Sequence, residues 1–299
     1  MKLEGVIAAI VTPFGMDGTL NELALRKICK FQLKKKINGI FILGSTGEGI
    51  LLSKEERKLV VEIVIDELRN LIPVVVHVGN SNINDVFELA EHAAKIGANA
   101  ISSIIPYFYK YNEREILEFY IELCRKVPQD YPVYVYNFPE AAGNDIAPEL
   151  LMELKNKSRN IAGLKFSSSN MEQMQEYIKL KNCGLNILTG CDQLFYPMLC
   201  LGCDGLVSGN ANILPELYLA MFNHFKSGNH NEARELHHSG SELAKLFNYG
   251  NIRDIKEAMK FVGLDGGYMR KPFLNMTSNE SKILQNNFEI IHNKIKSLI

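Results

Sequence analysis

Short runs of β-branched and apolar residues alternate with longer amphipathic stretches along most of this 299-residue chain. Each short run is nearly continuous in apolar residues, which is typical of parallel strands buried on both faces. The stretch 53–70 between two such runs has Ser53 and Glu56 in the pattern of a capping box and apolar residues at helical spacing, which predicts a helix. The eight predicted strands are 5–11, 39–43, 73–78, 98–105, 132–137, 161–166, 185–189 and 205–207.

Eight strand–helix units within about 225 residues predict a closed (β/α)8 barrel, the TIM-barrel class, rather than an open doubly wound sheet. The Gly-x-Gly-x-x-Gly fingerprint that many open sheets use for dinucleotides is absent. After Pro215 the alternation stops, and the patterns over 232–247, 253–262 and 278–298 predict helices. We therefore expect a barrel over residues 1–226 and a C-terminal helical extension over residues 227–299.

Composition and charge exclude several classes of protein. A hydrophobic content of 46% supports a full core, and a net charge of −1 with interspersed signs gives no field that would recruit nucleic acid. No apolar run reaches the length of a membrane-spanning helix or of a signal peptide, so we expect a cytoplasmic protein without a membrane partner. The six cysteines are scattered, and the one close pair, Cys200 and Cys203, lacks the further ligands of a zinc site, so we expect no metal.

Two predicted strands end in reactive side chains, Tyr136 and Lys165. Burying an ammonium group in an apolar interior is costly, and an amine that has lost its proton is a nucleophile toward carbonyl carbon. The alternative is a lysine whose amine reaches water at the strand end. Because side chains alternate along a strand, Tyr136 shares a face with Tyr134 and Phe138. Lys165 likewise shares a face with Gly163 and Ser167. If both faces point into the barrel, the phenol and the amine converge.

The segment Gly44-Ser45-Thr46-Gly47-Glu48-Gly49 follows the second predicted strand. A glycine-rich turn with two hydroxyls can direct backbone N–H groups at a carboxylate or phosphate, although the same residues also make ordinary turns. Active sites of such barrels lie at the carboxyl ends of the strands, where this turn and the two reactive residues would meet. A tyrosine and a lysine above an anion-binding turn suit imine chemistry on a 2-keto acid. A buried tyrosine otherwise serves as an aromatic with a satisfied hydroxyl.

Four motifs together resemble the dihydrodipicolinate synthase and N-acetylneuraminate lyase family over essentially the whole chain. They are Gly-Ser-Thr-Gly-Glu, Tyr-Asn-Phe-Pro, Gly-Leu-Lys and Arg270-Lys271-Pro272-Phe273. The resemblance implies a class I pyruvate-dependent aldolase or lyase, built as a barrel with C-terminal helices and commonly homotetrameric. It implies no metal or organic cofactor.

Carried onto the matching positions, the resemblance assigns roles to individual residues. Lys165 would form the Schiff base and Tyr136 would shuttle the proton. Ser45 and Thr46 would hold the carboxylate of pyruvate, and Val207 would line the pyruvate end of the site. Further predicted substrate-binding positions are Gly190, Asp192 and Gln193.

The choice of substrate follows from departures at a few of these positions. Dihydrodipicolinate synthases carry an arginine that binds the carboxylate of their aldehyde substrate, and Ala141 stands at that position. Sialic acid lyases place a glutamate at the position of Gln193 and a serine at that of Gly209. The stretch 136–146 most resembles 2-keto-3-deoxygluconate aldolases. We therefore expect cleavage of a 2-keto-3-deoxy sugar acid to pyruvate and a sugar-derived aldehyde. The alternatives, in order, are an N-acetylneuraminate lyase and a 4-hydroxy-tetrahydrodipicolinate synthase. A non-catalytic, pyruvate-binding regulatory barrel is the alternative outside enzymes.

One departure concerns proton transfer. Family members usually supply a tyrosine from the neighbouring subunit, and the corresponding position here is Phe108, flanked by Tyr107 and Tyr109. A phenylalanine cannot relay a proton. Either Tyr109 substitutes through a shifted loop, or the relay runs through Ser45 and Tyr136 alone.

Overall fold

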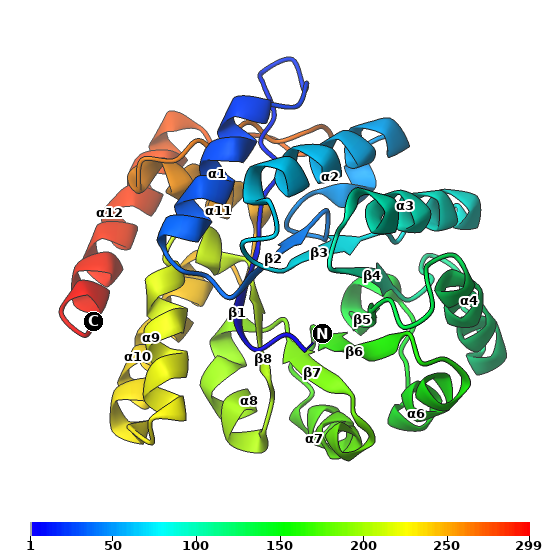
Figure 1. The fold of residues 1–299 in the computed structure, drawn as a ribbon. Helices are drawn as coiled ribbons and strands as arrows, with labels where there is room; N and C mark the ends of the chain where they lie inside the picture. The colour runs from blue at the N-terminus through cyan, green and yellow to red at the C-terminus, as the bar shows by residue number, and fades with distance from the viewer. Residues whose placement is uncertain (1) are drawn as a thin grey trace.

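Eight parallel strands close into a barrel in the order of the sequence, as the alternating pattern predicts (Figure 1). The computed structural model describes residues 2–299. Every strand pairs with the next one along the chain, and β8 pairs back onto β1. The strands are β1 Gly5–Ala9, β2 Gly39–Ile42, β3 Val74–His77, β4 Ala100–Ile104, β5 Val133–Asn137, β6 Ile161–Phe166, β7 Asn186–Thr189 and β8 Gly205–Ser208.

Helices follow the strands around the outside of the barrel. Those of the β/α units are α1 Glu22–Lys34, α2 Lys54–Leu68, α3 Ile83–Ile96, α4 Glu113–Arg125, α5 Pro139–Ala142, α6 Pro148–Lys157, α7 Met171–Lys179, α8 Phe195–Leu201 and α9 Pro215–Lys226. Short 3-10 turns lie at η1 Gly49–Leu51, η2 Leu180–Cys183, η3 Asp192–Leu194 and η4 Asn210–Asn212. The predicted capping box is present at α2, where the Ser53 and Glu56 side chains each accept from the backbone N–H of the other residue.

Several strands are shorter than the apolar runs that predicted them. The run 5–11, for example, gives a strand that ends at Ala9. Beyond it the N–H of Val11 donates to the Asn212 side chain, 3.1 Å away, instead of to a neighbouring strand. Apolar residues past the last ladder bond still face the core, so hydrophobicity alone overestimates strand length.

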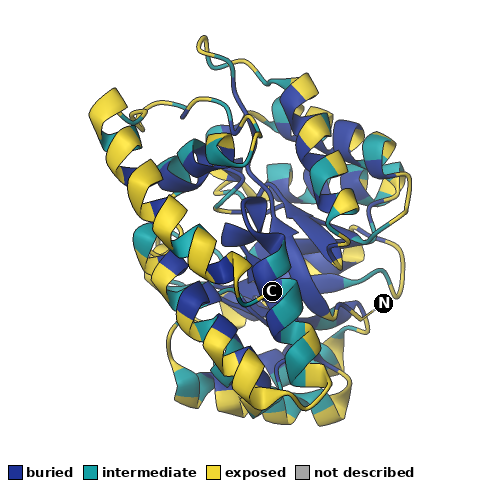
Figure 2. Cartoon of the chain, turned by 90° about the vertical axis from the view of Figure 1, so that its left-hand side faces the viewer, coloured by how far each residue is buried: buried dark blue, intermediate teal, exposed yellow. Residues whose placement is uncertain are grey.

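The strands are buried on both faces, as Figure 2 shows by their dark blue colour against the exposed outer surfaces of the helices. A large cluster of apolar side chains fills the space between strands and helices. A smaller one fills the barrel interior and consists of Leu3, Ile7, Ala9, Phe41, Val75, Ala100, Tyr134, Leu188 and Val207. The interior is therefore a packed core, and a site can open only where this packing ends.

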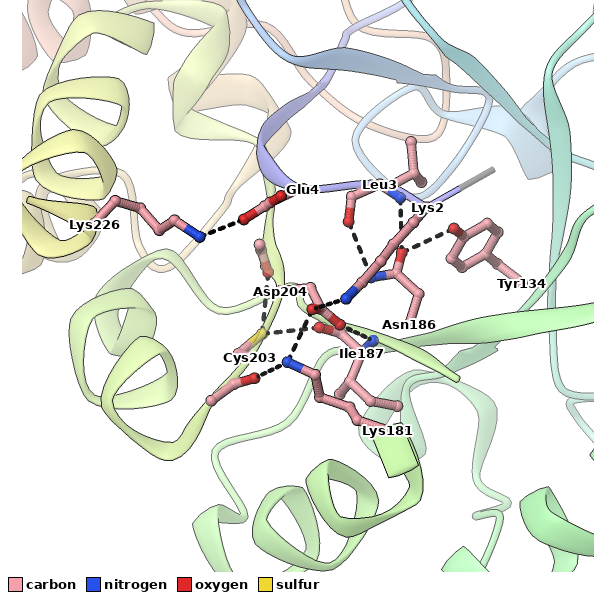
Figure 3. Close-up of polar contacts among 12 residues, drawn as sticks. Lys2, Leu3, Glu4, Tyr134, Lys181, Asn186, Ile187, Cys203, Asp204 and Lys226 are labelled. Carbon is pink, nitrogen blue, oxygen red and sulfur yellow. Dashed lines mark hydrogen bonds and ion pairs between the residues drawn. The ribbon is translucent and has the colours of Figure 1, made fainter. Parts of the chain in front are cut away.

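The N-terminal segment closes the amino end of the barrel (Figure 3). Asn186 donates to the carbonyl of Leu3 at 2.9 Å and accepts from its N–H at 3.0 Å. The Tyr134 hydroxyl also donates to Asn186, at 2.8 Å. Beside them, Asp204 forms ion pairs with Lys2 and Lys181, both at 2.9 Å. With this end closed, a ligand must enter at the carboxyl ends of the strands.

Three helices follow the last β/α unit: α10 His230–Leu246, α11 Ile252–Phe261 and α12 Ser278–Lys296. In Figure 1 the red α12 lies beside the yellow α10, and these two helices are in contact. The helix α10 also packs on α9, α8 and η3, so it reaches the carboxyl end of the barrel. A division of the chain between residues 226 and 227 remains a prediction.

Candidate active site

Lys165 and Tyr136 lie side by side on neighbouring strands, because their Cα atoms are register partners between β5 and β6. The Nζ atom of Lys165 lies 3.8 Å from the centroid of the Tyr136 ring and 4.6 Å from that of the Phe41 ring. Only 6% of the lysine is exposed. Within the described part of the chain no carboxylate forms an ion pair with this amine. Aromatic faces stabilise a cation by their quadrupoles, so the same box suits an ammonium or an iminium nitrogen.

The Tyr136 hydroxyl connects this pair to the glycine-rich turn. Its oxygen lies 3.3 Å from Oγ of Ser45, and either hydroxyl can donate. Ser45 is exposed and Thr46 is half-buried, so the turn borders an open space. A phenol and a serine hydroxyl in contact can pass a proton between a bound ligand and water.

The predicted site residues line one cavity of about 320 Å³ at the carboxyl end of the barrel. The structure thus brings together all the residues selected from the sequence, namely Ser45, Thr46, Tyr136, Lys165, Gly190, Asp192, Gln193 and Val207. The sequence analysis did not select several further lining residues as site residues, among them Glu140, Ser167, Ser168, Cys191, Asn210, Ala244 and Tyr249. For Ser167 and Ser168 a signal existed, since these hydroxyls directly follow the strand that carries Lys165. Ala244 and Tyr249 come from α10 and the loop after it, which only the fold brings to the site.

Glycines create room at two points of the site. A Cβ on Gly190 would lie 1.9 Å from Oγ of Ser167 and 3.3 Å from Cε of Lys165. A Cβ on Gly49 would lie 1.8 Å from the carbonyl oxygen of Leu43. Side chains at either position would displace the groups that define the cavity and its turn.

Buried ionic contacts hold the glycine-rich turn in place. Glu48 adopts a left-handed conformation, with φ of 53°, and its carboxylate forms an ion pair with Lys256 of α11. The N–H of Arg270 donates to the same carboxylate at 3.3 Å. The Arg270 guanidinium binds both oxygens of Glu56, at 2.8 and 2.6 Å, in a bidentate pair. The Arg-Lys-Pro-Phe motif therefore supports the turn from outside.

His77, the last residue of β3, fixes the ends of two neighbouring strands. Its Nε2 accepts from the N–H of Ile104 at 3.1 Å, so Nδ1 carries the proton and donates to the carbonyl of Leu43 at 3.1 Å. Burial holds the pKa of His77 well below its usual range, and the nearby Arg57 and Lys165 charges act in the same direction. The neutral ring packs edge-on against Tyr136, with centroids 5.8 Å apart. The imidazole thus contacts both the Tyr136 ring and the start of the glycine-rich turn.

Asp192 is a buried carboxylate at the wall of the cavity. The Ser208 hydroxyl donates to it, and burial raises the pKa of Asp192 to about 6 despite that bond. The adjacent Gln193 is only half-buried and also lines the cavity. These two side chains offer hydrogen bonds to a polar ligand.

A second cavity of about 370 Å³ lies against the other side of Ser45 and Tyr136. Its remaining walls are mostly apolar and include Ile104, Tyr107, Ala141 and Phe273. Phe108 has a φ of 77° and is 84% exposed, and its ring packs edge-on against that of Tyr109. Neither Phe108 nor Tyr109 lines either cavity of its own chain, whereas Tyr107 does. The two routes for proton relay therefore remain open predictions.

Residues 2–299 provide neither a cluster of metal ligands nor a membrane-spanning helix. No group of three or more His, Cys, Asp or Glu side chains there could hold a metal ion. None of the helices in that range combines the length and apolarity needed to cross a bilayer.

The family model that matches this chain describes the dihydrodipicolinate synthetase family and covers residues 2–291. A 4-hydroxy-tetrahydrodipicolinate synthase from Methanothrix thermoacetophila is 38% identical over 93% of this chain and 94% of its own length. An N-acetylneuraminate lyase from Fusobacterium nucleatum is 30% identical over 93% of this chain and 95% of its own length.

Among solved structures, 2-keto-3-deoxygluconate aldolase from Sulfolobus solfataricus is similar, with a TM-score of 0.91 and 27% identity over 98% of both chains. One of its structures is a variant in complex with L-2-keto, 3-deoxy-galactonate, and another is a complex with D-KDPG. The match over nearly the whole length, together with the lysine and tyrosine in one cavity, leads to a single conclusion. The chain belongs to the dihydrodipicolinate synthetase family of pyruvate-dependent, class I aldolase-type carbon–carbon lyases.

Proposed function

We propose that this protein cleaves a 2-keto-3-deoxy sugar acid, such as 2-keto-3-deoxygluconate, reversibly to pyruvate and an aldehyde. The observation that carries the proposal is the lining of the cavity beyond Lys165. The polar side chains of this lining carry hydroxyl, amide and carboxylate groups, which can hydrogen-bond to the hydroxyls of a sugar tail. They include those of Ser167, Ser168, Asp192, Gln193 and Asn210. Similarity to an aldolase held in complex with a 2-keto-3-deoxy sugar acid supports the same class of substrate.

The proposed reaction begins at Lys165. Its Nζ attacks C2 of the keto acid, and loss of water leaves an iminium that withdraws electrons from C3. Tyr136 takes the proton of the C4 hydroxyl, the C3–C4 bond breaks, and its electron pair moves into an enamine while the aldehyde departs. Protonation of the enamine at C3 and addition of water at C2 then release pyruvate and regenerate the free amine. The same steps in reverse form the aldol.

The remaining predicted roles fit the positions of the side chains around Lys165. In the proposal, the hydroxyls and N–H groups of Ser45 and Thr46 bind the substrate carboxylate, and the Ser45 contact to Tyr136 couples that turn to proton transfer. Val207 is 3% exposed and belongs to the apolar interior below the site, where the methyl end of pyruvate would pack.

A 4-hydroxy-tetrahydrodipicolinate synthase is the competing candidate, because a 38% identical relative carries that name. Its aldehyde substrate brings a second carboxylate, which an arginine binds in the enzymes that this chain resembles. Here Ala141 borders the apolar second cavity, and no cationic side chain among the described residues lines that space. The N-acetylneuraminate lyase named among the relatives is a further candidate. The polar half of the cavity, by contrast, matches a polyhydroxy tail without a second anion.

The first experiment is borohydride trapping with pyruvate, read by intact mass and peptide mapping. A single reduced adduct on Lys165 is expected. Turnover is then compared for 2-keto-3-deoxygluconate and N-acetylneuraminate by release of pyruvate, and for aspartate semialdehyde by its pyruvate-dependent consumption. Cleavage of the 2-keto-3-deoxy sugar acid with the highest kcat/KM supports the proposal. Preference for either other substrate refutes it, and an adduct without any turnover indicates a pyruvate-binding regulatory barrel.

The variant Ala141→Arg provides a matched test of the substrate assignment. It should add the missing carboxylate clamp and raise any condensation with aspartate semialdehyde, while cleavage of the sugar acid stays equal or falls. We also propose a homotetramer in the cytoplasm, in line with the family resemblance. Sedimentation velocity at several concentrations tests the oligomeric state.

A further inference from the structure

The cavity carries negative charge in its polar half. Glu140, at the start of α5, and Asp192, in η3, both line it. Among residues 2–299 the one cationic side chain in the lining is Lys165, and during the proposed reaction its nitrogen is bonded to C2 of the substrate, away from the tail. A substrate tail beyond C4 would therefore meet carboxylates and no compensating cation of this chain.

Glu140 is held at the mouth of this space by a specific contact. Its Oε1 accepts from the Ser168 hydroxyl at 2.8 Å, which ties α5 to the loop after β6. Both residues line the cavity that contains Lys165. The carboxylate of Glu140 is exposed, so its second oxygen is available to a ligand.

Further hydrogen-bond acceptors belong to buried residues of the lining. Asp192 accepts from Ser208, and Asn210 donates its amide N–H to the Tyr218 hydroxyl at 3.1 Å. The other end of that amide, Oδ1 of Asn210, is buried and has no hydrogen-bond partner among the described residues. Asn210 as a whole is 1% exposed and lines the cavity. A buried acceptor without a partner is costly, and a ligand hydroxyl that reaches this oxygen would gain a hydrogen bond.

From these groups we infer that the site selects unphosphorylated sugar acids, whose terminal hydroxyls donate to the acceptors, and rejects the corresponding terminal phosphates. A phosphate dianion offers acceptor oxygens only, and the carboxylates of Glu140 and Asp192 repel it. Glu140 is then a specificity-determining residue. The inference rests on the proposed function, because it assumes a 2-keto-3-deoxy sugar acid bound at Lys165.

An internal competition tests the inference directly. The enzyme is mixed with equal amounts of 2-keto-3-deoxygluconate and its 6-phosphate, reduced with borohydride, and analysed by intact mass, which separates the two full-length adducts and the pyruvyl adduct. Initial rates of pyruvate release from each substrate alone give kcat/KM. We expect a preference of about tenfold or more for the unphosphorylated acid in both readouts.

Charge variants then assign the effect to Glu140. Glu140→Gln should reduce the preference and Glu140→Lys should reduce it further, mainly through KM for the phosphorylated substrate. Glu149→Gln is the control, since it removes an exposed carboxylate of α6 that does not line the cavity, and it should leave the preference unchanged.

The outcomes separate this inference from the proposed function. Equal use of both sugar acids, or an unchanged preference in both Glu140 variants, overturns the inference while the proposed function stands. A pyruvyl adduct formed from added pyruvate, with no adduct and no turnover from either sugar acid, overturns the proposed function and this inference with it. The inference and the proposed function are both supported if the preference for the unphosphorylated acid falls in Glu140→Gln and falls further in Glu140→Lys, while Glu149→Gln leaves it unchanged.

Discussion

The amine of Lys165 lies over the face of the Tyr136 ring, with Nζ 3.8 Å from the ring centroid, because the two residues are register partners on adjacent parallel strands. The phenol oxygen at the edge of that ring lies 3.3 Å from the Ser45 hydroxyl. The Tyr136 side chain thus contacts the Lys165 amine through its ring and the glycine-rich turn through its oxygen. Imine formation and proton transfer can therefore be tested separately.

Replacing Lys165 by alanine should abolish the borohydride-trapped adduct and leave the fold intact. The lysine contributes no ion pair within the described residues, so its removal leaves no carboxylate unpaired. Intact mass after trapping and far-UV circular dichroism check the two expectations. Lys179→Ala, at an exposed lysine of α7, is the control and should trap normally. A Lys165→Ala variant that still turns over would refute the Schiff-base mechanism.

Replacing Tyr136 by phenylalanine should preserve pyruvate trapping and slow cleavage by roughly a hundredfold or more, the usual contribution of general acid–base catalysis. Tyr134→Phe is a matched control on the same strand face. Its hydroxyl bonds to Asn186 at the closed end of the barrel, 2.8 Å away, so its loss should lower the free energy of unfolding by about 1 kcal/mol without changing kcat. Single-turnover kinetics and urea unfolding provide the two measurements. Equal loss of kcat in both variants would argue against proton transfer by Tyr136.

Asp192 should make the protein less stable as pH rises. Burial raises the pKa of Asp192 from 3.8 to about 6 in the folded state, so between pH 4 and 6 the unfolded chain has lost a proton that the folded chain still holds. The free energy of unfolding therefore falls through this window, by on the order of 2 kcal/mol from this group. Asp192→Asn should remove that contribution. Urea unfolding of both proteins at pH 4.5, 5.5 and 7 measures it, and parallel pH profiles would contradict the assignment.

Breaking the buried pair between Glu48 and Lys256 should destabilise the protein strongly. Lys256 is 2% exposed, and Lys256→Met leaves the Glu48 carboxylate buried without its cation, at a cost of about 3 kcal/mol or more. Adding Glu48→Gln in the same chain should recover part of that loss. Because Glu48 lies in the turn that contains Ser45, KM for pyruvate should rise in the single variant and fall back in the double variant. Denaturant midpoints that are the same for both variants would show that the charge is not the cause.

The sequence alone was sufficient to predict the barrel and to single out Lys165 and Tyr136 at the ends of neighbouring strands. Buried parallel strands require nearly continuous apolar runs, and a lysine or tyrosine at the end of such a run is conspicuous because polar groups there are costly. The alternation of side chains along β5 and β6 also predicted that Tyr136 and Lys165 would face the same space. Ser45, Thr46, Gly190, Asp192, Gln193 and Val207 were reached through motif resemblance, and the structure brings them into the same cavity.

Only the tertiary structure decided which other groups reach that cavity. The contact between Glu140 and Ser168 joins residues 28 positions apart, and Ala244 and Tyr249 reach the site through the packing of α10 on the barrel. Likewise, the ring nitrogens of His77 form hydrogen bonds to the backbone of Leu43 and Ile104, which lie at the ends of neighbouring strands. Local patterns reflect the burial and the conformation of neighbouring residues. Contacts between distant segments depend on how strands and helices pack, so the charge and shape of the substrate site emerge only when the barrel has closed.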